Sequence, residues 1–180
     1  MLAELQFARY RVVVDADGLP EIYEAYREHA ELAEELDLLS PEKASCFFGV
    51  GTGEGWPTLV VAQSYSPSGS GFAPGILIVP ETATVLIGAG DRLLAYSLES
   101  SPTRVWTDVA DLGFWGWSRY GDVVLMSAEL ELAAWTTRGV KLWTTFVEPP
   151  WGFRVEGDRV LLDVMGRTMT FGIAEGPGAR

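Results

Sequence analysis

The sequence of 180 residues contains one cysteine, Cys46, and one histidine, His29. A single thiol excludes an internal disulfide and a Cys-x-x-Cys site, and it fits a reducing compartment, so we expect a cytoplasmic protein. One residue of each type is too few for a zinc site or for a Ser-His-Asp or Cys-His nucleophile. We therefore predict no metal centre, no cofactor and no catalytic residue of these kinds. His29 is interpreted as a helix-surface residue and Cys46 as a small buried hydrophobic residue.

Basic residues are also scarce. The chain has 13 lysines and arginines against 25 aspartates and glutamates, a formal net charge of -12. A surface of this charge repels phosphates, which excludes nucleic acid and anionic membranes as partners and leaves a basic protein or a neutral or cationic small ligand. No apolar run approaches the roughly 18 residues that a membrane helix needs, and the first residues lack the pattern of a secretory signal. We therefore expect a soluble, unprocessed protein.

The first 45 residues contain two different periodicities. Residues 5–14 mix apolar, aromatic and polar side chains and are predicted to form one strand, followed by a turn at 15–18. Residues 20–39 place apolar side chains at steps of three and four, which predicts an amphipathic helix that packs on a sheet. The opposite face of this helix is acidic. It supplies the candidate contacts for a basic protein partner, which are Glu24, Glu28, Glu31 and Glu35.

After residue 45 the composition shifts to β-branched and aromatic residues punctuated by glycine and proline. Short strands at the spacing of an antiparallel meander are predicted over 46–50, 58–65, 75–79, 84–88, 93–98, 104–109, 114–120, 123–128, 130–136, 140–147, 153–156, 159–164 and 168–173. Residues 49–55 are rich in glycine. No helix follows them to bind a phosphate, so we interpret them as a hairpin connection with positive φ. Residues 64–75 are predicted to form a Ser/Gly/Pro loop and are a candidate flap.

The second half of the sequence repeats itself. Residues 84–96, 123–135 and 159–171 align without gaps, and each segment opens with apolar residues and closes on an aromatic residue, namely Tyr96, Trp135 or Phe171. The first two segments continue in step, because Arg-Val-Trp-Thr at 104–107 matches Lys-Leu-Trp-Thr at 141–144. Equivalent units predict that the three closing aromatic residues are buried at equivalent strand positions. They also predict that three other residues are exposed at equivalent positions, namely Arg92, Glu131 and Arg167.

A period near 40 residues built from strand–turn–strand units is typical of propeller blades. On these residues, the segment 84–173 resembles the blade repeats of PQQ-type and WD40-like β-propellers. The smallest propellers need four blades of about 40 residues, and too few residues follow position 45 for a complete ring. We therefore predict a mainly β (α+β) fold in a single domain, residues 1–180. It is an antiparallel meander of about three blade-like repeats, open or barrel- or sandwich-like, with one amphipathic amino-terminal helix.

Tryptophan is abundant, with seven residues in the chain. Strand alternation at 114–117 predicts that Trp115 and Trp117 point to the same face of a sheet. Together with Trp151 they form a candidate aromatic platform beside Asp111 and Glu148. Such a platform binds a sugar or an organic cation by stacking. Packing of the three rings in the core is the alternative interpretation.

Three functional hypotheses follow from these patterns. The first is a non-enzymatic protein-interaction module whose acidic surface selects a basic partner. The second is a small-ligand binding domain, with carbohydrate as one ligand class, that uses the aromatic platform. The third is a carboxylate hydrolase, which requires two carboxylates that face each other across roughly 5 to 10 Å. The candidate carboxylates are Asp108, Asp111, Glu129, Glu131 and Glu148.

Overall fold

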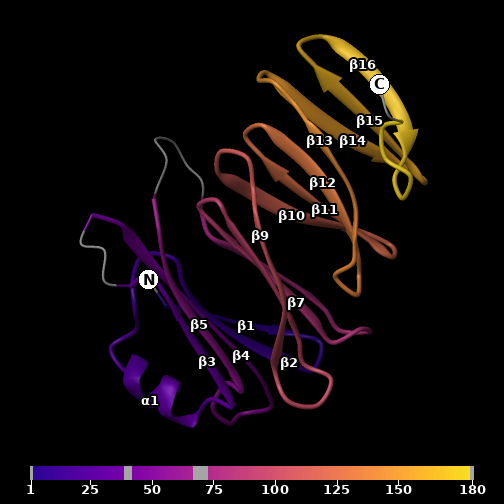
Figure 1. Cartoon of the computed structure of the whole chain (residues 1–180). Coiled ribbons are helices and arrows are strands. Elements are labelled where there is room, and N and C mark those ends of the chain that lie inside the picture. Colours follow the sequence, from indigo (N-terminus) through magenta and orange to yellow (C-terminus); the bar gives the residue numbers. More distant parts are fainter. Residues whose placement is uncertain (1, 39–41, 67–72, 179–180) are drawn as a thin grey trace.

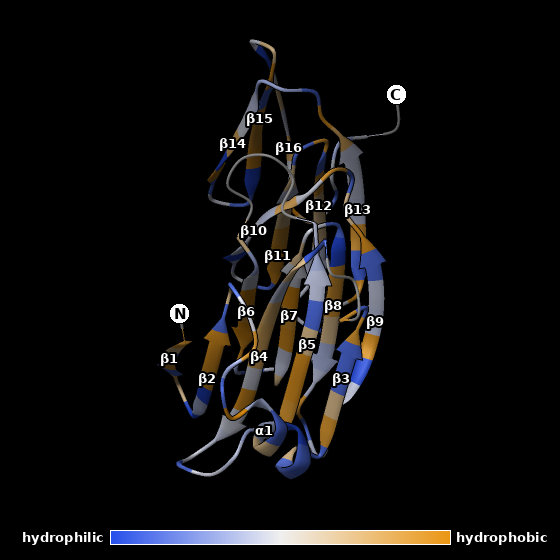
Figure 2. Cartoon of the chain, turned by 90° about the vertical axis from the view of Figure 1, so that its left-hand side faces the viewer, coloured by the Kyte–Doolittle hydropathy of each residue, from blue (hydrophilic) through white to orange (hydrophobic). Residues whose placement is uncertain are grey.

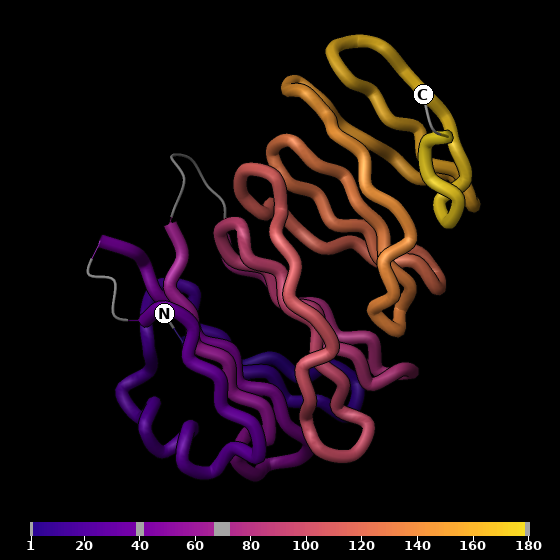
Figure 3. The backbone as a smooth tube through the Cα atoms, viewed as in Figure 1, coloured from indigo at the N-terminus to yellow at the C-terminus, as the bar shows by residue number. Residues whose placement is uncertain are grey.

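The structure is a computed structural model that describes residues 2–38, 42–66 and 73–178. Four β-sheets, here called A to D, follow one another along the chain and stack into an open arc (Figure 1). The amino terminus belongs to one end of the stack and the carboxy terminus to the other (Figure 3). The described residues thus form a mainly β, meander-like fold with one helix. Each sheet has two edges, so none of the four closes into a barrel.

Sheet A has the strand order β1-β2-β4-β5-β3. Its strands are β1 (Leu2–Phe7), β2 (Tyr10–Asp15), β3 (Leu32–Leu36), β4 (Ala44–Thr52) and β5 (Leu59–Tyr65). The prediction of one strand over 5–14 is wrong, because Ala8 adopts a φ of 53° and the chain turns back as a β1–β2 hairpin. All six residues of β1 are exposed at the edge of the sheet.

The helix is shorter than predicted. α1 spans Tyr23–His29, whereas the pattern predicted a helix over 20–39. The backbone is extended at Ala30 and continues as β3, which pairs in parallel with β5. Two residues four positions apart, such as Leu32 and Leu36, point to the same face in a helix and also in a strand. Their spacing therefore does not distinguish a helix from a strand. Pairing with β5 supplies backbone hydrogen bonds to the segment, and it also avoids the repulsion of glutamates four residues apart on a helix.

Sheets B, C and D are antiparallel, and their strands are in chain order. Sheet B contains β6 (Gly75–Val79), β7 (Thr84–Ala89), β8 (Arg92–Ser97) and β9 (Thr103–Val109). Sheet C contains β10 (Phe114–Tyr120), β11 (Val123–Ala128), β12 (Glu131–Thr136) and β13 (Lys141–Phe146). Sheet D contains β14 (Trp151–Glu156), β15 (Arg159–Val164) and β16 (Arg167–Gly172). The strands predicted after residue 45 match these strands, β4 and β5, with small differences at the ends.

The sequence repeat has a structural counterpart in the strand register. Val85 pairs with Tyr96 in sheet B, Val124 with Trp135 in sheet C, and Val160 with Phe171 in sheet D. The three aromatic side chains are at most 8% exposed, which confirms their equivalent buried positions. The exposure predicted at the second set of positions holds for Arg167, but Arg92 is half-buried and Glu131 is buried. The three repeats therefore share one strand register, but their equivalent polar residues differ in exposure.

Each closing aromatic residue packs on the sheet before it. The Tyr96 hydroxyl donates to Glu34 of sheet A at 2.7 Å, the Trp135 ring stacks on Trp106 of sheet B, and Phe171 meets Trp143 of sheet C edge-on. The two indole N–H groups on the outer strands donate forward, from Trp106 to the Gly139 carbonyl and from Trp143 to the Ile173 carbonyl. The same kind of contact therefore joins B to C and C to D.

Apolar layers fill the spaces between successive sheets, and the two ends of the stack are covered differently. Hydrophobic residues dominate β2 and β5, whereas α1, β3 and β9 carry many hydrophilic residues (Figure 2). On the outer face of sheet A, Tyr23 and Tyr26 of α1 pack on Phe47. The outer face of sheet D is polar and exposes residues such as Arg154 and Asp163. Neither end therefore offers an apolar face to a further sheet.

Two loop predictions have different outcomes. Gly53, between β4 and β5, has a φ of 72°, which confirms a hairpin connection with positive φ in the glycine-rich segment. The predicted flap over 64–75 lies largely at residues 67–72, outside the described residues. Its first two residues belong to β5.

Cys46 offers a test of the packing between sheets A and B. Burial raises the pKa of its thiol to about 12, against about 8.5 for a free cysteine. Below pH 8.5 the thiol is protonated in both states, so stability is unaffected by its ionisation. Above this pH the unfolded state ionises first, and the free energy of unfolding falls by up to about 1.4 kcal/mol per pH unit.

We therefore expect urea unfolding between pH 8 and 10 to show a steeper loss of stability for the parent chain than for Cys46→Ala. The buried tyrosines contribute equally to both proteins, so the difference between the two curves isolates the thiol. Parallel curves would contradict the burial of Cys46.

Candidate functional site

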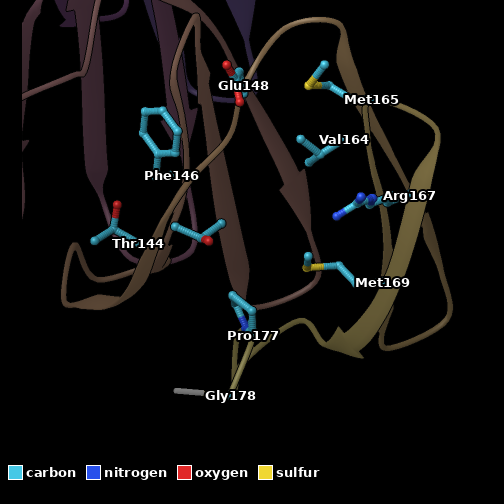
Figure 4. Close-up of a pocket in the computed structure, with 10 residues that line it drawn as sticks. Thr144, Phe146, Glu148, Val164, Met165, Arg167, Met169, Pro177 and Gly178 are labelled. Atoms are coloured by element: carbon cyan, nitrogen blue, oxygen red, sulfur yellow. The ribbon is translucent and has the colours of Figure 1, made fainter. Parts of the chain in front are cut away.

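A groove of about 770 Å³ runs between β13 of sheet C and the β15–β16 hairpin of sheet D (Figure 4). Val164, Arg167 and Met169 point into it from the sheet D side, whereas the side chains of Thr144 and Phe146 on β13 point away from sheet D (Figure 4). The remaining lining residues are Thr145, Glu148, Met165, Pro177 and Gly178. The groove thus brings together the last strand of sheet C, the last strand of sheet D and the carboxy-terminal tail.

The groove lies where sheet D departs from sheets B and C. In those sheets a fourth strand, β9 or β13, pairs with the third strand. In sheet D the third strand, β16, pairs with β15 and forms the edge of the sheet. A further strand beside β16 would direct alternate side chains toward β13, because side chains alternate between the faces of a sheet. The groove lies beside this edge, and the tail occupies part of the place of such a strand, because Gly176 packs on Trp143 and its N–H donates to the Gly172 carbonyl.

Apolar and polar side chains line the groove together, with Thr144, Thr145, Glu148 and Arg167 beside Phe146, Val164, Met165 and Met169. Phe146 is 66% exposed and Met165 is 59% exposed, which is high for large apolar side chains. Glu148 lies at the end of the groove near Met165, and Arg167 lies between Val164 and Met169 on its sheet D side (Figure 4). Beyond the other end, the exposed carboxylate of Glu175 in the tail lies against the backbone of β16. A side chain at Gly172 would collide with it.

The structure brings together two of the three candidate tryptophans. Trp115 of β10 stacks on Trp151 of β14 with ring centroids 5.0 Å apart and planes 9° apart. Trp151 also stacks on Phe153, and its indole N–H donates to the Glu129 carbonyl at 2.8 Å. Trp115 is 38% exposed, so this stack presents a ring to solvent between sheets C and D.

Trp117 does not belong to this stack, and the prediction that it shares a sheet face with Trp115 is wrong. The pairing of β10 with β11 shifts between Phe114 and Gly116, which places a β-bulge at Trp115. A bulge inserts one extra residue and reverses the alternation that follows it. Trp117 therefore packs on Phe114 and Trp135 in the layer between sheets B and C.

The candidate carboxylates occupy separate environments. Asp111 is exposed, and its backbone N–H donates to the Glu131 carboxylate at 3.0 Å. Glu131 also accepts a hydrogen bond from the Thr144 hydroxyl and lies 4.0 Å from the Lys141 ammonium. Glu131 is the first residue of β12 and is only 6% exposed. Its carboxylate contacts the Asp111 N–H, the Thr144 hydroxyl and the Lys141 ammonium. This arrangement fits a structural role and does not support an acid–base role.

The four acidic residues predicted to bind a basic partner do not form one helical stripe. Glu24 and Glu28 lie on α1, whereas Glu35 lies on β3 and Glu31 just before it. Arg27 forms ion pairs with Glu24 and Glu35, and the Tyr23 hydroxyl also donates to Glu35. Part of the predicted negative surface is therefore neutralised within the chain.

No protein-family model and no curated protein match the chain. Among solved structures it is similar to the crystal structure of the computationally designed Ika8 protein, with 10% identity, a TM-score of 0.30, and coverage of 94% of this chain and 70% of that chain. A TM-score this low carries no argument, so the resemblance to propeller blades stays a prediction. Within the described residues, no helix combines the length and the apolar character needed to cross a membrane.

The sequence predictions included Glu148 but missed the other residues that line the groove. One signal for them was present. The segments ending at Tyr96 and Trp135 are followed by the matching Arg-Val-Trp-Thr and Lys-Leu-Trp-Thr motifs, whereas Phe171 is followed by Gly-Ile-Ala-Glu-Gly-Pro-Gly. Among the described residues, the segment that follows Phe171 therefore does not match the start of the fourth strand in the other two repeats.

Glu131→Gln should destabilise the protein by about 1–3 kcal/mol, because an amide NH₂ would face one of two donors that now point at a buried carboxylate. Urea unfolding at pH 7 measures this loss. Glu129→Gln is the matched control, because Glu129 is only half-buried, and it should change stability by less than about 0.5 kcal/mol. Equal effects of the two substitutions would contradict the assigned role of Glu131.

Proposed function

We propose that this protein is a non-enzymatic protein-interaction module that binds an extended segment of another protein in the groove between sheets C and D. One observation carries the proposal. Sheet D ends at its third strand, β16, beside a groove of about 770 Å³, whereas sheets B and C each have a fourth strand. The bound segment pairs with β16 and completes sheet D, a mode of recognition known as β-strand addition.

The backbone of β16 supports this proposal. An edge strand presents unpaired N–H and C=O groups that can pair with another chain, and proteins protect such edges with proline, charge or covering segments. The β16 sequence, Arg-Thr-Met-Thr-Phe-Gly, contains no proline, and its one charge is at the first residue, Arg167. The tail covers the end of this edge, where the Gly176 N–H donates to the Gly172 carbonyl. The residues before Gly172 carry no proline and one charge, so this part of the edge can pair with another chain.

The side chains around the groove supply a second contribution. Met165 is large, apolar and more than half exposed, and it lies on the same hairpin as the half-buried Val164 and Met169. Contiguous exposed apolar surface marks interaction sites on soluble proteins. Main-chain pairing along β16 provides affinity, and the groove beside it, which is lined by both apolar and polar side chains, selects the side chains of the segment.

A second candidate function rests on Trp115. Its exposed ring, held parallel to Trp151, forms a flat surface of the kind that stacks on a sugar. Trp117 takes no part in this surface, so the proposed platform is smaller than the sequence predicted. The exposed face belongs to one indole ring, and we place this function second for that reason.

The groove can be tested with a peptide whose sequence the fold already accepts as a fourth strand. A fluorescein-labelled peptide with the sequence of residues 141–146, Lys-Leu-Trp-Thr-Thr-Phe, should bind the chain saturably in fluorescence anisotropy titrations. Met165→Asp should weaken this binding at least five-fold, because it places a charge in the apolar wall that the peptide covers.

Leu112→Asp is the matched control for Met165→Asp. Leu112 is also apolar, 62% exposed and at a φ of 53°, against 59% and 54° for Met165, but it lies in the β9–β10 connection. Binding by the Leu112→Asp variant should equal that of the parent chain. Absence of saturable binding, or equal weakening by both variants, would refute the proposed function.

Acrylamide quenching tests the second candidate function. Trp115→Phe in a Trp56→Phe background should remove most of the quenchable fluorescence, because Trp56 and Trp115 are 43% and 38% exposed, whereas Trp117→Phe should leave it nearly unchanged. If the platform binds a β-linked disaccharide such as cellobiose, adding the sugar should protect Trp115 from acrylamide. Unchanged quenching at saturating sugar would remove this candidate.

A further inference from the structure

We infer that strand β1 pairs with β1 of a second copy of the chain, so that the two A sheets join edge to edge through an antiparallel pair centred on Leu5. This surface is separate from the groove between sheets C and D and does not depend on the proposed function. Three observations support the pairing. They are the exposed apolar side chains of β1, its unprotected edge, and a register in which its sequence is complementary to itself.

Strand β1 forms the outer edge of sheet A beside β2 (Figure 2). Leu5 pairs with Val12, and Phe7 pairs with Tyr10, so both side chains of β1 lie on the face of sheet A that packs on sheet B. Val12 and Tyr10 are buried in this layer, whereas Leu5 is 57% exposed and Phe7 is 50% exposed. β1 therefore extends an apolar layer beyond the part that sheet B covers.

The edge of β1 lacks the devices that protect other edges in this fold. Proteins protect edge strands with bulges, charged side chains or covering segments. A bulge interrupts each of β9, β10 and β13, and β3 and β14 each carry two charged residues. β1 pairs with β2 without a register shift and contains no proline and no basic residue. Its one charge, on Glu4, is paired with Arg11 of β2 within the chain.

The β1–β2 hairpin determines which backbone groups are free at this edge. A two-residue turn closes at the pair of Phe7 and Tyr10, and such a closing pair exchanges its backbone hydrogen bonds. Every second residue of β1 therefore bonds to β2, while Leu2, Glu4 and Gln6 direct their N–H and C=O groups to the open edge. A second β1 can satisfy these groups only in registers that pair even-numbered residues with even-numbered residues.

Two antiparallel registers meet this condition with the longest overlap. One is centred on Glu4 and places two glutamates directly opposite each other, which is destabilising. The other is centred on Leu5 and places Leu5 opposite Leu5 and Ala3 opposite Phe7 on the inner face. On the outer face it places Glu4 opposite Gln6, an amide that can donate to the carboxylate. This register contains no pair of like charges, so the pairing is centred on Leu5.

The pair has two-fold symmetry and uses the same edge of both copies, so assembly stops at a dimer. An apolar row then crosses the junction, in which Val12 and Leu5 of one copy are followed by Leu5 and Val12 of the other. The backbone pairing satisfies the free N–H and C=O groups of both edges at once. The interface consists of two short strands, so association is reversible and depends on concentration.

Sedimentation velocity over about a hundredfold range of concentration tests the pairing, and the parent chain should show a monomer–dimer equilibrium. Leu5→Lys should weaken the dimer at least about ten-fold, because two cations would then face each other at the centre of the pair. Leu2→Lys is the matched control. Leu2 is apolar, 45% exposed and on the same strand, but it lies outside the paired residues 3–7, so the dimer should weaken less than about two-fold.

Gln6→Lys tests the register. It would place a lysine opposite Glu4 in each half of the pair, and two exposed ion pairs should tighten the dimer about two- to ten-fold. Adding Glu4→Gln to this variant should remove the gain. An effect of net charge alone would instead increase the gain, because Glu4→Gln lowers the negative charge of the chain further.

Four results would overturn the proposed pairing. They are a parent chain that stays monomeric, equal weakening by Leu5→Lys and Leu2→Lys, a gain from Gln6→Lys that persists with Glu4→Gln, and a dimer that responds to Met165→Asp but not to Leu5→Lys. The labelled peptide should bind the Leu5→Lys variant as it binds the parent chain, because β1 is remote from the groove in the stack. Failure of the dimer therefore leaves the proposed function standing, and failure of peptide binding leaves the dimer standing.

Discussion

The structure depends on one constraint, the need of each small sheet to bury its faces against its neighbours. A sheet with apolar faces must bury them against another element, and in this fold the neighbouring sheets provide that cover. A repeated contact meets this need, in which the closing aromatic residue of one sheet packs on the outer strand of the sheet before it. The strand register is common to the three repeats because a two-residue turn joins the paired strands in each of them, at residues 90–91, 129–130 and 165–166.

The same constraint explains why the candidate site lies at the last junction. Helix α1 covers the first sheet and polar side chains cover the last, so the stack ends without an exposed apolar face. Between sheets C and D, however, Trp143 and its neighbours on β13 face a sheet with no fourth strand. The tail covers Trp143 through the Ile173 carbonyl, and the rest of the space remains as the groove.

Predictions that depended on the hydrophobic pattern and on turn residues were largely confirmed. The prediction that assumed an unbroken strand alternation was wrong. The strands after residue 45 and the equivalence of Tyr96, Trp135 and Phe171 follow from hydrophobic pattern and turn residues. The shared face of Trp115 and Trp117 required unbroken alternation, which one bulge reversed. For the site, the sequence singled out Glu148, while the other residues that line the groove had no motif of their own.

The sequence by itself determined the class of fold, the repeat and the surplus of negative charge, because these depend on composition and on side-chain spacing within a few residues. Only the tertiary structure decided that residues 32–36 form a strand, since their spacing suits a helix equally well and pairing with β5 settles the choice. It also decided that Glu131 is buried among donors and that the edge of β16 borders a groove. Both facts depend on which strands are neighbours in space, a property that no local pattern encodes.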